Sequence, residues 1–223
     1  MRHFDELLEQ LRAKLLEMSG LVQSSISDST RALTGKNSAL AQRVFKGEGQ
    51  INRLELEIDQ LATSLLATEQ PVATDLRFIT AAAKINSNLE RIGDLSQNIA
   101  ERAMALINEP RVDVRVDLTQ LASLVETMVE MALDAFVSKD PQQARRVLMS
   151  EGGVDDLRDA TFAQLIDAMK KNSQAVQYCV DLMFAARSLE RIADHATNIA
   201  ESVLFMVEGV DVRHHAAHAE AHS

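Results

Sequence analysis

Apolar residues recur every three or four positions along most of this chain, which is the spacing of an amphipathic helix. The longer apolar runs cover residues 4–33, 51–68, 70–108, 118–136 and 174–207. Shorter runs at residues 37–46 and 140–149 lie just before glycine-containing segments, and we expect two short helices that end there. The pattern therefore predicts an almost entirely α-helical chain.

Several residues mark where these helices begin and end. Gly35 suits the C-terminal cap of the first helix, and Gly209 suits the end of the last one. Asn37 suits the N-cap of the helix that follows, and Asp140 with Pro141 opens a helix in the second half. Because the connections between helices are short, we expect antiparallel neighbours, as in a helical bundle.

The second half of the chain repeats the first. Residues 188–201 match residues 88–101 at most positions, with an offset of 100. Upstream of this match the offset is 103, and Glu48 pairs with Glu151 and Leu54 with Leu157. Helical composition alone does not produce such collinear agreement by chance. The chain is therefore an internal duplication.

The fold class that we predict is all-α, with two tandem, duplicated three-helix bundles and one additional short helix in each. The first bundle is expected to cover residues 1–109 and the second residues 117–208, with a proline-containing linker between them. Residues 209–223 are rich in histidine. We expect a disordered, solvated tail there, and the alternative is that its histidines bind a transition metal.

The repeated segment carries two carboxylates one helical turn apart, Glu90 and Asp94 in the first half and Glu190 and Asp194 in the second. On a helix these acids lie opposite the apolar face. Like charges at this spacing destabilise an isolated helix by roughly 0.2–0.5 kcal/mol. Their repetition therefore indicates a positive partner, and carboxylate oxygens suit hard metal ions. The alternatives are a solvated face, or acids that accompany duplicated core packing.

Further oxygen donors lie near these acids in the pattern. On the same helical faces they are Asn98, Glu101, Asn198 and Glu201. The preceding helices also carry acids at i,i+4 spacing, which complete a site if they face the motif and otherwise lie in solvent. These acids are Glu55, Asp59, Asp155 and Asp159.

Composition and charge exclude several classes of function. The formal net charge is −10, which disfavours both a nucleic-acid surface and attraction to an anionic membrane. The single cysteine, Cys179, lies in an apolar run and is expected to be a buried structural thiol. The charged, amphipathic start does not look like a signal peptide, and no apolar window is long enough to span a bilayer. We therefore expect a soluble cytoplasmic protein.

No arrangement of residues predicts catalysis. His195 follows Asp194, but its angle on the helix places it near the apolar flank, so we expect a partly buried or interface residue. The Glu-x-x-His pairs of di-iron enzymes are missing from the motif helices, and no Ser-His-Asp arrangement has local support. We therefore predict that the protein is not an enzyme. The alternative is a carboxylate-metal-cluster hydrolase or oxidase on a helical bundle.

Three segments together closely resemble the PhoU family of phosphate-uptake regulators. They are Gln70 to Arg77, Leu89-Glu-Arg-Ile-Gly-Asp94, and Ala186 to Asp194 followed by Asn198-Ile-Ala-Glu201. The resemblance extends from about residue 4 to His214 and departs from the common motif at Ala193, where glycine is usual. Alanine is nearly as small, so close approach of the helices is expected to survive.

This resemblance implies a fold, a cofactor and a role. It implies the two-bundle helical fold and metal sites at Glu90 with Asp94 and at Glu190 with Asp194, holding iron, zinc, manganese or magnesium. The implied role is negative regulation of phosphate uptake and phosphate-starvation signalling. The implied partners are the ATPase of the phosphate ABC transporter and the phosphate-sensing histidine kinase, between which the protein is an adaptor. We also expect a homodimer.

Overall fold

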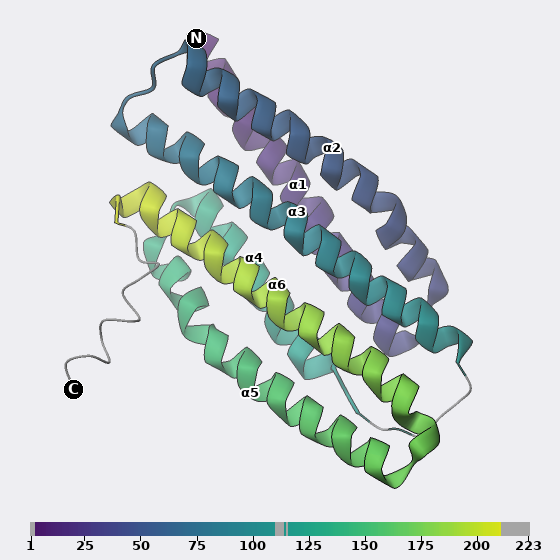
Figure 1. The fold of residues 1–223 in the computed structure, drawn as a ribbon. Helices are drawn as coiled ribbons and strands as arrows, with labels where there is room; N and C mark the ends of the chain where they lie inside the picture. The colour runs from purple at the N-terminus through teal and green to yellow at the C-terminus, as the bar shows by residue number, and fades with distance from the viewer. Residues whose placement is uncertain (1–2, 110–113, 115, 211–223) are drawn as a thin grey trace, which may run out of the picture.

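Long α-helices make up nearly all of the computed structural model of the protein, which describes residues 3–109, 114 and 116–210 (Figure 1). The elements are α1 (His3–Gly35), α2 (Ser38–Thr68), α3 (Ala73–Asn108), α4 (Thr119–Ser138), α5 (Pro141–Lys171), the 3-10 helix η1 (Ser173–Ala175) and α6 (Val176–Glu208). These described residues form no strand, so the predicted all-α class is confirmed. None of their helices is both long and apolar enough to cross a bilayer. Most of the predicted linker and the histidine-rich tail beyond residue 210 lie outside the described residues.

The two short helices predicted from the sequence are not separate elements, and that prediction was wrong. α2 continues through Gly47 and Gly49, and α5 continues through Gly152 and Gly153. A glycine costs a helix interior about 1 kcal/mol relative to alanine. The apolar stripe of each helix nevertheless stays in register across its glycines and is buried, so burial outweighs local propensity. The buried residues on either side are Val44 and Ile51 in α2, and Val147 and Val154 in α5.

Most of the predicted helix ends are correct. Asn37 and Asp140 each cap the helix that follows, with a side-chain oxygen that accepts hydrogen bonds from backbone N–H groups of the first turn. Gly209 ends α6 in the left-handed conformation, with a φ of 73°. The end of α1 differs from the prediction: Gly35 is still helical, and Lys36 takes the left-handed conformation with a φ of 49°.

Each half of the chain folds into one three-helix bundle, and the bundles pack together through α3 and α6. These two helices run antiparallel through the centre of the molecule, with α1 and α4 behind them and α2 and α5 at the outer edges (Figure 1). α3 and α6 share the most extensive packing of any pair of described helices. The predicted tandem, duplicated bundles are thus confirmed, and the two motif helices are central.

The core is mainly aliphatic, as the composition predicts. Its buried aromatic residues include Phe78 and Phe136, whose rings stack with centroids 6.2 Å apart. Cys179 is fully buried in α6, and this burial raises the pKa of its thiol. The prediction of a buried cysteine is confirmed.

Gly93, inside the first motif, marks a tight contact between α3 and α2. A Cβ atom at this position would lie 3.2 Å from Cδ1 and 3.3 Å from Cγ2 of Ile51. The second half carries Ala193 and Val154 at the equivalent positions. Compared with the first half, the second half thus has one more methyl group on the motif helix, at Ala193, and one fewer carbon on the preceding helix, at Val154.

We predict that Gly93→Ala and Ile51→Val compensate each other. Ile51→Val alone is expected to lower the free energy of unfolding by about 1 kcal/mol. Gly93→Ala alone should also lower it by about 1 kcal/mol, because crowding outweighs the gain in helix propensity. The double variant should lose only about 0.5 kcal/mol, as measured by urea denaturation in a double-mutant cycle. Additive losses would show that the two side chains do not compete for space.

Candidate functional site

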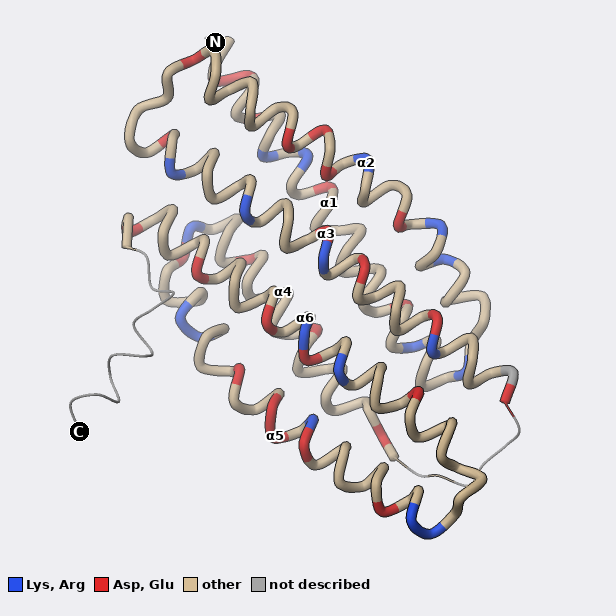
Figure 2. The backbone as a smooth tube through the Cα atoms, viewed as in Figure 1, with Lys and Arg blue, Asp and Glu red and all other residues tan. Residues whose placement is uncertain are grey.

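The acidic motif of each half lies at the edge of a buried helix face. Leu89 and Ile92 are fully buried in α3, and this burial fixes the rotation of the helix about its axis. Glu90 consequently points to the contact with α2, and its side chain is 22% exposed. Glu190 occupies the same place between α6 and α5 and is 12% exposed. Figure 2 shows that acidic positions recur along all four of these helices, interspersed with lysine and arginine.

In the first half, Glu90 lies near enough to Asp94 and Glu55 for their charges to act on it. Burial is the main cause that raises the pKa of Glu90, and the negative charges of Asp94 and Glu55 raise it further. Arg91 opposes this shift, with guanidinium nitrogens 3.4 Å from Glu90 Oε2 and 3.2 Å from Asp94 Oδ2. The Arg91 side chain is 59% exposed, so this is a solvent-screened surface pair.

Asn86 lies one helical turn before Glu90 and is completely buried. Its Nδ2 atom donates to Asp59 Oδ1 and to the backbone oxygen of Glu55, both at 3.0 Å, which ties α3 to the acidic face of α2. Its Oδ1 atom is also buried but accepts no hydrogen bond from the described residues. A buried acceptor without a donor is costly unless a cation or a water satisfies it.

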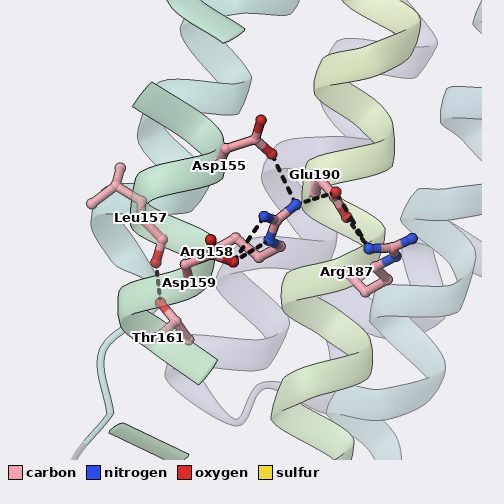
Figure 3. Close-up of polar contacts among 7 residues, drawn as sticks. All are labelled: Asp155, Leu157, Arg158, Asp159, Thr161, Arg187 and Glu190. Carbon is pink, nitrogen blue, oxygen red and sulfur yellow. Dashed lines mark hydrogen bonds and ion pairs between the residues drawn. The ribbon is translucent and has the colours of Figure 1, made fainter. Parts of the chain in front are cut away.

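In the second half, an arginine fills the corresponding space. Arg158 of α5 contacts three carboxylates at once (Figure 3). Its Nη1 atom donates to Asp155 Oδ1 at 2.8 Å and to Glu190 Oε1, and its Nη2 atom donates to Asp159 Oδ1 at 2.8 Å. Arg187 of α6 adds a second ion pair, with Nη1 3.1 Å from Glu190 Oε2.

Asp194 lies at the outer rim of this cluster. Burial of its carboxyl group by its neighbours raises its pKa, and the charges of Glu190 and Asp155 raise it further. The pKa of Glu151, on α5, is raised by burial and then by Asp194 and Asp155. A patch of excess negative charge therefore remains on the solvent side of Arg158.

The remaining predicted donors are distributed differently. Asn98 and Glu101 are exposed on α3. Asn198 and Glu201 line a groove of about 250 Å³ between α6 and α3, together with Lys84, Asn88 and Phe205. The structure thus places the second pair of donors at the contact between the bundles, further along α6 than the acidic motif.

His195 is the interface residue that its helical angle predicts. The ring is half-buried, and its Nδ1 atom lies 2.8 Å from Asn88 Oδ1 on α3. Burial lowers the pKa of His195, and the positive charges of Arg191 and Arg91 lower it further. The histidine therefore joins the two bundles.

Sequence reasoning did not single out Asn86, Glu151, Arg158 or Arg187, which all lie in or beside these acidic clusters. Arg158 could have been found, because the offset of 103 places it against Glu55. The sequence does not indicate that Asn86 is buried, since the periodicity of α3 does not show that its amide reaches α2. These residues determine which charges and hydrogen bonds surround the carboxylates in each half.

The two halves differ in how well they fit a metal ion. Within the part of the chain that the structure describes, no three His, Cys, Asp or Glu side chains are already grouped as metal ligands. In the first half Glu55, Glu90 and Asp94 offer carboxylate oxygens, and Asn86, one helical turn before Glu90, has a buried amide oxygen without a donor among the described residues. This oxygen-donor set fits a hard cation once Arg91 turns aside. In the second half Arg158 already contacts Glu190, Asp155 and Asp159, and Asp194 lies outside these contacts.

Fold and sites together define a class of protein, an all-α duplication in which each half presents a Glu-x-x-x-Asp motif at a helix contact. A family model described as "PhoU domain" matches the chain twice, at residues 15–103 and 118–203. The chain belongs to the PhoU family, and the predicted family is confirmed.

Relatives match over nearly the full chain. A "Phosphate-specific transport system accessory protein PhoU homolog" of Pseudomonas aeruginosa is 40% identical over 216 residues, which is 96% of this chain and 88% of the relative. The "Phosphate-specific transport system accessory protein PhoU" of Serratia marcescens is 35% identical, over 95% of this chain and 87% of the relative.

Solved structures agree with the fold. The crystal structure of PhoU from Pseudomonas aeruginosa superposes with a TM-score of 0.90 at 38% identity, covering 93% of this chain and all of that one. The phosphate transport system regulatory protein PhoU from Streptococcus pneumoniae gives a TM-score of 0.86 at 26% identity, with 94% and 99% coverage.

Proposed function

We propose that this protein is a cytoplasmic negative regulator of phosphate uptake and of phosphate-starvation signalling. The observation that carries the proposal is the match, over more than nine-tenths of the chain, to relatives named as accessory proteins of the phosphate-specific transport system. In this proposal the protein is an adaptor that links the ATPase of the phosphate ABC transporter to the phosphate-sensing histidine kinase. It acts as a homodimer and catalyses no reaction itself.

Metal binding is part of this proposal, and the first-half site supports it. Besides burial, the negative charges of Asp94 and Glu55 both raise the pKa of Glu90, and the buried Oδ1 of Asn86 accepts no hydrogen bond from the described residues. A bound cation relieves both conditions, and an all-oxygen donor set favours manganese, magnesium or iron over zinc. The cation supplies positive charge that stiffens the α2–α3 contact or bridges to an acidic group on a partner.

The competing function is that of a carboxylate-metal-cluster enzyme. Catalysis by such a site requires a base or nucleophile other than the metal ligands. In the second half, three carboxylates are engaged by Arg158, and His195 is hydrogen-bonded to Asn88 across the bundle contact. Regulation by binding accounts for these engaged side chains better than catalysis does.

The adaptor role predicts specific partners in a pull-down. The tagged chain should recover the transporter ATPase and the sensor kinase from phosphate-replete cells, as identified by mass spectrometry. Phosphate-starved cells should yield less of the kinase, because repression is then relieved. A tagged helical protein of similar size and acidity serves as the control bait. Equal recovery of both partners by that control, or recovery of neither by the chain, would contradict the adaptor role.

A further inference from the structure

The duplication allows the two acidic sites to be compared residue by residue. The offset of 103 pairs Glu55 of α2 with Arg158 of α5, so a negative side chain in one half corresponds to a positive one in the other. The offset of 100 pairs Ser87 of α3 with Arg187 of α6. Both differences add positive charge around Glu190, whereas Glu90 has only the exposed Arg91 of its own helix.

Arg158 sits where a shared cation would sit. Its guanidinium group lies among carboxylates from two helices, Asp155 and Asp159 of α5 and Glu190 of α6 (Figure 3). The Arg158 side chain is only 17% exposed. An arginine is always charged and offers several fixed N–H donors, so it can satisfy several carboxylate oxygens at once.

Among the described residues of the first half, no arginine from the neighbouring helix contacts Glu90. Arg91, which contacts Glu90 and Asp94, comes from the same helix and is mostly exposed, so it can leave without uncovering buried surface. The fully buried Asn86 points its amide at the same stretch of α2 that carries Glu55, and its Oδ1 atom has no donor. In this half a buried oxygen without a hydrogen bond thus lies one helical turn from uncompensated carboxylates. Glu190 Oε2 in the second half is also buried without a hydrogen bond among the described residues, but it lies 3.1 Å from the cationic Nη1 atom of Arg187.

We infer that the two sites of this chain are not equivalent: the first half binds the metal ion, and in the second half Arg158 replaces it. This inference rests on the proposed metal binding and assigns it to one bundle. The second site is then an ion cluster that holds α5 against α6 whether or not metal is present. Only the contact between α2 and α3 responds to metal supply, so metal regulates one bundle of the pair.

Titration with Mn²⁺, followed by the electron paramagnetic resonance signal of the free ion, tests this assignment. The purified full chain should bind Mn²⁺, Asp94→Asn should lose that binding, and Asp194→Asn should keep it. Arg158→Glu gives the second half the residue that the first half has at Glu55. It should increase the bound Mn²⁺ at saturation by about twofold, because both halves then present oxygen ligands.

Two controls keep the result interpretable. Arg146→Glu makes the same change of charge on α5 at an exposed arginine outside the cluster, and it should leave Mn²⁺ binding unchanged. Arg158→Gln removes the positive charge without adding a negative one and should also increase binding. It is the second variant if Arg158→Glu does not fold, as judged by circular dichroism.

The outcomes separate this inference from the proposed function. Equal losses in Asp94→Asn and Asp194→Asn, with no gain in the folded Arg158 variants, would overturn the inference and leave metal binding intact. Absence of Mn²⁺, magnesium or iron binding by the wild-type chain would overturn metal binding itself, and the inference with it.

Discussion

Deleting this protein from its host is expected to turn on the phosphate-starvation genes while phosphate is still abundant. A negative regulator holds the kinase in its repressing state, so its loss should bring expression to the level of starved wild-type cells. A reporter under a starvation promoter, measured in phosphate-replete medium, gives the result directly. Restoring the wild-type chain on a plasmid should return the reporter to its repressed level. Normal repression in a clean deletion strain would contradict the regulatory role.

The same strain can show whether the first-half metal site matters in the cell. Asp94→Asn is expected to fail to restore repression, and Asp194→Asn is expected to restore it, provided that immunoblots show equal amounts of both. Comparing partner recovery by the two variants then separates two roles of the metal. A folded Asp94→Asn chain that no longer recovers the kinase or the ATPase indicates that the cation bridges to a partner. A less stable chain that still recovers them indicates an internal clamp.

Arg102→Met is expected to lower the free energy of unfolding by about 3 kcal/mol, because it leaves a buried carboxylate without its cation. Asp181 of α6 is 1% exposed, and its Oδ1 atom lies 3.1 Å from Arg102 Nη1 on α3. Gln177 donates to the other carboxylate oxygen at 3.1 Å. The Arg102 guanidinium group also lies over the ring of Phe184, 5.1 Å from its centroid. This ion pair joins the two bundles.

Urea denaturation of matched variants measures that effect. Arg145→Met is the control, because the Arg145 side chain is 42% exposed, close to the 40% of Arg102, but its partner Glu208 is 28% exposed. The control should lose much less stability than Arg102→Met. Adding Asp181→Asn to Arg102→Met should recover part of the loss, because the uncompensated charge is then gone. Equal losses in the two arginine variants would show that Asp181 is not the cause.

The ion pair of Arg102 and Asp181 also shows how far the duplication extends. The offset of 100 pairs Asp181 with Ala81 and Arg102 with Ser202, so the repeat contains this pair only once. Helix positions were duplicated, and the side chains that join the halves diverged afterwards. The same divergence separates Glu55 from Arg158. Equivalent positions in the two bundles therefore do not imply equivalent chemistry.

The sequence by itself determined the helical class, the duplication and the faces of the motif helices. Periodicity places Leu89 and Ile92 together on the apolar side of a helix, because 3.6 residues per turn relates sequence spacing directly to angle. It also predicted the acids on the opposite side, but Glu90 and Glu190 lie at the edge of the buried face. Capping is equally local, so Asn37 and Asp140 could be recognised as helix starts from the few residues around them. These features depend on neighbours along the chain.

Only the tertiary structure shows which helix and which side chains pack against each helix face. Local propensity predicts a break at Gly47 and Gly49, but burial of the whole α2 stripe against distant helices keeps the helix continuous. Likewise, the partners of Glu190 depend on how α5 is rotated and spaced relative to α6. The periodicity of one helix gives neither the rotation nor the spacing of its neighbour. The ion pair between Arg158 and Glu190 could therefore be identified only from the tertiary structure.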